Sequence, residues 1–175
     1  METTNLAGLY ELPDLAWADV VEPLDKLTMA PGTGGPDRHS CWLATLDADG
    51  APHVTGIGAQ WHRGTFWFET GEHTRKGRNL ARDSRCTISV ATRTHDVTFE
   101  GTAELVEDPA LVAELAAVWA EGGWPCEVDQ SGVRLTAPFS APSAGKPPWA
   151  VYRMTITSAT ALSCVEPGGA TRFDF

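Results

Sequence analysis

A succession of short segments that alternate apolar and polar residues, separated by turn residues, limits this chain to a strand-rich fold. The clearest pair is 41–46 and 52–61, because the intervening Asp47-Ala-Asp-Gly50 places a glycine where a hairpin turn needs a left-handed residue. Successive strands without regular long helices favour a closed or split antiparallel barrel over a doubly wound parallel sheet. The other predicted strands are 65–70, 86–92, 97–106 and 152–162, with shorter ones at 133–136 and 171–175.

Three helices are expected around these strands. Residues 14–27 carry apolar side chains at helical spacing, with Asp14 as the N-cap and Pro23 as a point where the helix can split. Thr74 caps a short helix over 75–82. In the third helix, which ends at Gly122-Gly123, Asp108 is the cap and Pro109 takes the first helical position.

At 175 residues the chain is long enough for one domain with a sizeable core, 1–175. It divides into an N-terminal helix and loop (1–38, with Pro and Gly at 29–37) and a barrel core that holds the cofactor loop (39–107). A helix (108–123) follows, and then a substrate loop with C-terminal strands (124–175). The stretch 124–149 is rich in Pro, Gly and Ser, and we expect it to shape a substrate pocket.

Charge and cysteine spacing exclude several classes of function. The formal net charge of −10 argues against nucleic acid as the partner. No apolar run has membrane length and the first twenty residues lack a basic leader, so a cytoplasmic protein with no membrane partner is expected. The four cysteines form no CxxC pair and the histidines lack ligand spacing, so no metal site is predicted.

Positive charge is concentrated in residues 74–85, which hold five of the thirteen basic residues of an acidic chain. A capped helix start next to Arg75 and Lys76 offers free N–H groups, the positive end of the helix dipole and two cations. These features predict an anion site, and a phosphorylated cofactor is the natural anion. The alternative is a solvated basic helix face. The remaining cations, Arg78, Arg82 and Arg85, are expected to face solvent or pair with acidic neighbours.

Seven tryptophans are many for a domain of this size. The indole N–H needs a partner when it is buried, so some of these side chains are expected to line a cleft or a subunit interface. The count therefore favours a homodimer with an apolar contact surface.

Four segments, in this order and spacing, resemble the flavin and deazaflavin oxidoreductases of the split β-barrel type, the pyridoxamine 5′-phosphate oxidase-like family. They are WLATLDADGAPHVT (42–55), TFWFET (65–70), TRKGRNL (74–80) and DVTFEGTAE (96–104). The resemblance implies a mainly β (α+β), FMN-binding, antiparallel split β-barrel with a few peripheral helices. It also implies a homodimer that binds FMN or coenzyme F420 between its subunits; some relatives hold haem or biliverdin instead.

The resemblance implies cofactor-binding roles for nine residues. Thr74, Arg75 and Lys76 match the phosphate grip, and Thr70 matches a position that touches the ribityl-phosphate arm. Glu69, the residue before Thr70, is counted among the cofactor-binding residues. Val54, Thr55 and Gly56 match the strand that lies along the isoalloxazine ring. Asp96 stands where flavin-binding oxidases carry a ring-binding Gln.

Two departures argue against pyridoxamine 5′-phosphate as the substrate. An ionised Asp96 cannot donate the hydrogen bond that Gln donates, and the C-terminal Arg-x-His element of the oxidases is missing. The leading hypothesis is therefore hydride transfer between F420 or FMN and another small conjugated organic substrate, with Arg78 and Arg82 near the polyglutamate tail of F420. The alternatives are a haem- or bilin-binding protein, in which one of the five histidines is a ligand, and a non-catalytic flavin carrier.

Overall fold

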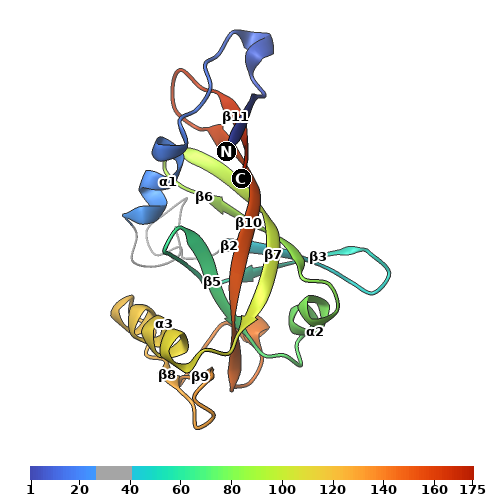
Figure 1. Cartoon of the computed structure of the whole chain (residues 1–175), viewed down its shortest axis with the longest axis vertical. Coiled ribbons are helices and arrows are strands. Elements are labelled where there is room, and N and C mark those ends of the chain that lie inside the picture. The colour runs from blue at the N-terminus through green and yellow to red at the C-terminus, as the bar shows by residue number, and fades with distance from the viewer. Residues whose placement is uncertain (27–40) are drawn as a thin grey trace.

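One long strand organises the molecule. The computed structural model describes residues 1–26 and 41–175, and β10 (Trp149–Ser163) runs through its centre with β7 (His95–Val106) alongside (Figure 1). The two strands pair from Val151↔Val106 to Ser163↔His95, with a bulge between Ile156 and Ser158. Opposite this bulge lies Gly101, where an added Cβ would be 2.0 Å from the carbonyl oxygen of Thr155, so the close approach of the two strands requires glycine.

The sheet is antiparallel at each described pairing. Its main order is β1-β11-β10-β7-β6-β2-β3, and β5 adds to β10 and pairs with β4, while β9 adds to β10 and pairs with β8. The remaining strands are β1 (Glu2–Asn5), β2 (Cys41–Leu46), β3 (Pro52–Ile57), β4 (Ala59–His62), β5 (Thr65–Thr70), β6 (Arg85–Ala91), β8 (Glu127–Val128), β9 (Arg134–Thr136) and β11 (Ala170–Asp174).

Two buried clusters hold these elements together. The first fills the barrel with the inward side chains of the strands, among them Leu43, Phe68 and Phe99, and α1 (Trp17–Asp25) adds Val20 and Leu24. The second lies between α3 (Pro109–Glu121) and the outer side of β5, β9 and β10, and it contains Leu115, Trp119 and Trp149. The helices α2 (Arg75–Arg82) and α3 lie near the same end of the β7–β10 pair (Figure 1).

The mainly β split barrel expected from the sequence is confirmed, and so are α2, its Thr74 cap and the Asp108 cap of α3. The predicted strand 52–61 is wrong at Gly58: β3 pairs with β2, whereas β4 turns to pair with β5. The predicted Asp14 cap is also wrong, because the helix begins at Trp17 after an Ala16 cap without a side-chain bond. The preceding segment is instead tied to β11, where Leu15 N–H donates to Thr171 Oγ1 at 2.8 Å.

Trp119 and Trp124 line a cavity, as one of the two expectations for the tryptophans has it, whereas a tryptophan-rich subunit contact stays a prediction. Trp61, Trp67, Trp119 and Trp149 are buried, and Trp17 and Trp124 are half-buried, so only Trp42 is largely exposed. The second core beneath α3 hides more aromatic surface than the strand pattern alone indicated. The predicted loop 29–37 and the last residue of the predicted first helix, Leu27, lie outside the described residues. In residues 1–26 and 41–175, no helix combines the length and apolarity needed to span a membrane.

Candidate functional site

The start of α2 lies against the end of β5. Thr74 Oγ1 accepts a hydrogen bond from Gly77 N–H at 3.1 Å, donates to the carbonyl of Gly71 at 2.7 Å and lies 3.1 Å from Thr70 Oγ1. Thr70 is fully buried, so the strand end and the helix start form one rigid unit. The start of an eight-residue helix is thereby fixed beside the exposed Arg75, which is the arrangement that favours an anion.

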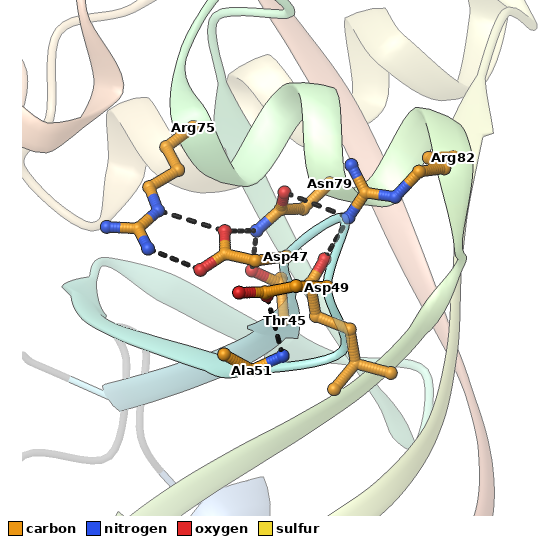
Figure 2. A network of polar contacts seen from close by, with 8 residues as sticks. Thr45, Asp47, Asp49, Ala51, Arg75, Asn79 and Arg82 are labelled. Carbon is orange, nitrogen blue, oxygen red and sulfur yellow. Dashed lines mark hydrogen bonds and ion pairs between the residues drawn. The ribbon is translucent and has the colours of Figure 1, made fainter.

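Arg75 is held by the β2–β3 hairpin turn. Its guanidinium makes a two-pronged ion pair with Asp47, with Nε at 2.9 Å from Oδ1, and Asn79 Nδ2 donates to the same Oδ1 at 3.0 Å (Figure 2). Hydrogen bonds from Arg75 and Asn79 lower the pKa of Asp47 below its usual range. The Arg75 side chain is nevertheless 58% exposed, so its outer face is open to a further anion.

Lys76 points the other way and is buried beneath η2 (Pro142–Ala144). Its ammonium donates to the carbonyl oxygen of Ser143, and burial lowers its pKa while the nearby Glu69 opposes that shift. Glu69 is buried on β5, where burial raises the pKa of its carboxyl group and a 2.7 Å hydrogen bond from Ser140 opposes the rise. The segment 140–143 therefore connects the acid on β5 with the cation on α2.

The exposed face of the β2–β3 hairpin is apolar. Trp42 lies opposite Gly56 and Ala44 opposite Val54, and Trp42 and Val54 are 55% and 56% exposed. Thr55 alternates to the inner face, opposite the buried Leu43. Since β3 is the last strand in the described sheet order, its outer edge has no strand partner there, and Ser143 Oγ donates to the carbonyl of Gly56 at 3.1 Å.

The structure therefore brings seven of the nine predicted cofactor residues to one region, where β3, the end of β5, the start of α2 and η2 meet. Glu69 is on the opposite face of β5, bonded to Ser140. Ser143 of η2 is hydrogen-bonded both to Gly56 on β3 and to Lys76 on α2. A third hydrogen bond links Thr70 on β5 to Thr74. A strand edge at Gly56 and a helix start with an exposed cation suit a planar molecule with a phosphate arm.

Asp96 is the more distant exception. It pairs with Leu162 near the far end of β10, whereas Thr70 pairs with Ala150. Twelve positions of β10 separate the two pairs, which at about 3.3 Å per residue is roughly 40 Å of strand. Within one chain, Asp96 therefore lies far from the phosphate site.

His53, His62 and His95 have separate surroundings. His62 Nε2 is 2.8 Å from Glu114 Oε1, His95 Nδ1 is 2.9 Å from Thr94 Oγ1, and His53 lies near Arg75, which together with burial lowers its pKa. Among residues 1–26 and 41–175, no group of three or more His, Cys, Asp or Glu side chains could hold a metal ion. His39 lies outside the described residues.

Sequence reasoning missed Asp47, Ser140 and Ser143 as members of this region. Asp47 was expected only as a turn residue, and its contact with Arg75 spans 28 positions. The two serines come from the 124–149 loop, whose composition indicates a loop but not where it folds back. No local signal could have found either contact.

Comparison with known proteins agrees with the fold. The model of the pyridoxamine 5′-phosphate oxidase family matches residues 35–162. A conserved hypothetical protein from Mycobacterium tuberculosis is 24% identical, with a TM-score of 0.56 over 84% of this chain and 84% of that chain. No curated protein sequence matches significantly.

Two further solved structures share the fold at lower identity. A protein from Clostridium acetobutylicum related to general stress protein 26, of the pyridoxinephosphate oxidase family, is 16% identical (TM-score 0.54, 78% of this chain and 86% of that chain). A heme binding protein from Mycobacterium smegmatis is 19% identical (TM-score 0.51, 75% and 52%). The family match covers most of the chain and the barrel agrees with it, so the chain belongs to the pyridoxamine 5′-phosphate oxidase family.

Proposed function

We propose that this protein is an oxidoreductase that binds FMN or F420 and transfers a hydride between the cofactor and a small conjugated organic substrate. The observation that carries the proposal is the start of α2, where the Thr74 cap and the exposed Arg75 lie beside the turn of the β2–β3 hairpin. Arg75 is the open cation of the pair, because the Lys76 ammonium is turned inward to Ser143.

The residues divide the work of holding the cofactor. The N–H groups at the start of α2 and the outer face of the Arg75 guanidinium bind the phosphate, while Lys76 adds positive charge from beneath. Val54 and Gly56 present apolar surface and a strand edge for the ring, and the buried Thr70 holds Thr74 in place beside the connecting arm. When bound, the flavin or deazaflavin supplies or accepts the hydride, and the protein contributes position and an apolar surrounding.

We further propose that the cofactor is shared between two copies of the chain. Asp96 and the phosphate region lie at opposite ends of the β7–β10 pair, so both can contact one cofactor only if Asp96 comes from a second copy. The exposed apolar face of Trp42 and Val54 is available for such a contact. Sedimentation at micromolar concentration tests this part, and a monomer would contradict it.

The site is tested by comparing two arginines. Arg75 and Arg85 are both exposed and each makes a two-pronged pair with an aspartate, Asp47 or Asp83, but only Arg75 is at the start of α2. Arg75→Ala should weaken FMN or F420 binding about 10-fold or more, since a charge-assisted hydrogen bond contributes about 1.5–3 kcal/mol. Arg85→Ala removes the same charge and should leave the affinity unchanged. Equal effects of the two variants would refute the assigned phosphate site.

A further inference from the structure

A cavity of about 330 Å³ lies on the side of the β4–β5 hairpin that faces α3. Its floor comes from the two strands, and its walls come from the end of α3 and the segment around 140. It is lined by Gly58, Ala59, Gln60, Glu69, Trp119, Gly122, Gly123, Trp124, Phe139, Ser140 and Ala141. Glu69 faces the cavity, whereas the next residue of β5, Thr70, faces Thr74. Because successive side chains of a strand point to opposite faces, the cavity and the start of α2 lie on opposite faces of β5.

Two buried acceptor atoms in this lining lack a hydrogen-bond partner among the described residues. They are Gln60 Oε1 and Glu69 Oε2, on side chains that are 2% and 8% exposed. The other polar atom of each side chain is engaged: Gln60 Nε2 donates to the carbonyl of Trp61 at 3.1 Å, and Glu69 Oε1 accepts from Ser140. These bonds fix the two side chains, and a buried acceptor without a donor is costly.

The nearby donors are directed to other partners. The hydroxyl of Ser140 is bonded to Glu69, the indole N–H of Trp124 donates to the carbonyl of Phe139 at 2.6 Å, and the Lys76 ammonium donates to Ser143. Among residues 1–26 and 41–175, no lysine or arginine lines the cavity. A ligand that satisfies the two acceptors must therefore bring its own N–H donors, and an anion would meet no cation.

The register of the hairpin shows that one ligand can reach both acceptors. Gln60 pairs directly with Trp67, so Glu69, two positions on, is its diagonal neighbour on the same face. Such neighbours have Cβ atoms about 7–8 Å apart, and a group with two N–H donors on one carbon can bridge the side chains. The walls suit a flat body, because Trp119 and Trp124 meet edge to face with ring centroids 5.9 Å apart.

We propose that this cavity binds a flat aromatic molecule that carries an amidine or an amino-substituted nitrogen heterocycle, through hydrogen bonds to Gln60 and Glu69. Binding does not require the cofactor. Only the further step, that such a molecule is the reducible substrate, rests on the proposed function. The chemistry is the opposite of a phosphate site, so the cavity selects against anionic ring compounds.

Benzamidine is a suitable probe, with benzoate as its anionic counterpart of the same shape. Titration of the full chain, followed by calorimetry and by the fluorescence of the wall tryptophans, should show saturable binding of benzamidine and none of benzoate. Glu69→Gln and Gln60→Leu should each lower the affinity about 10-fold or more. Glu121→Gln removes an exposed carboxylate at the end of α3 and is the matched control, with no change expected.

Gly58→Phe is a second test that leaves the buried pair intact. Gly58 is exposed at the cavity, and an added Cβ would meet nothing within 4 Å, so the larger side chain should block the cavity without disturbing the core. The proposal would be overturned if benzamidine failed to bind, or if benzoate bound as tightly as benzamidine. It would also be overturned if Gln60→Leu and Gly58→Phe bound benzamidine as tightly as the parent protein does. An FMN titration of Gln60→Leu separates this outcome from failure of the proposed function, because Gln60 has no part in the phosphate region.

Discussion

Gly77 holds α2 against the end of β5, and Gly77→Ala tests whether this contact positions the phosphate region. An added Cβ would lie 2.4 Å from the carbonyl oxygen of Gly71 and 2.9 Å from Cα of Glu72. These neighbours are backbone atoms, so they cannot rotate away. To restore an ordinary contact of 3.4 Å, α2 must move by about 1 Å from the strand end.

The magnitude follows from two opposing effects. Alanine is favoured over glycine inside a helix by about 1 kcal/mol, whereas overpacking a tight contact costs up to about 3 kcal/mol. We expect the free energy of unfolding to fall by about 2 kcal/mol, which lowers the melting temperature by roughly 4–8 °C in a chain of this size. Because the helix start shifts as well, FMN or F420 should bind more weakly than to the parent protein.

The assay is urea unfolding followed by tryptophan fluorescence, with a cofactor titration on the same samples. Gly58→Ala is the control: its Cβ meets nothing within 4 Å and its backbone is not left-handed, so stability should stay equal or rise slightly. A Gly77→Ala variant as stable as the parent, with unchanged cofactor affinity, would refute the close contact and its role in placing the site.

Three further outcomes follow from the structure. Burial raises the pKa of Glu69 in the folded protein, so the parent protein loses stability as the pH rises from the pKa of the unfolded state through that of the folded state. The stability of Glu69→Gln relative to the parent, measured by urea unfolding, should therefore increase from pH 4 to pH 8. A stability difference that stays constant over this range would contradict the prediction. Arg78→Ala should weaken F420 binding and spare FMN, because only F420 carries a polyglutamate tail; equal losses in parallel titrations would argue against this contact. The FMN-loaded protein should not convert pyridoxamine 5′-phosphate to its aldehyde under oxygen, and turnover on the order of 1 per second would restore that substrate.

The local parts of the fold could be predicted from the sequence. Alternation defined most strands, and the caps at Thr74 and Asp108 placed the starts of α2 and α3, because both signals lie within a few residues. β1 carries no such signal: its four residues are all exposed, and it forms only because β11 offers an edge. The break at Gly58 likewise depends on β5, which competes for the second half of the predicted strand.

The candidate site divides in the same way. The helix start and its cations could be predicted from residues 74–76, but the partners of those cations could not. Asp47 reaches Arg75 from a hairpin 28 positions away, and Ser143 reaches Lys76 across 67 positions. The unpartnered acceptors of Gln60 and Glu69 could not be predicted either, because the two residues line a cavity that depends on how α3 packs on β4 and β5.

The central claim is that a phosphorylated flavin or deazaflavin is held through its phosphate at the start of α2. Equilibrium titration of the cofactor-free protein with FMN and F420, each beside its dephosphorylated form, tests this most directly. At least one of the two cofactors should saturate one site per chain and bind about 10-fold or more tightly than the form without phosphate, as loss of charge-assisted hydrogen bonds requires. Equal affinity with and without the phosphate, or no binding of either cofactor, would contradict the account.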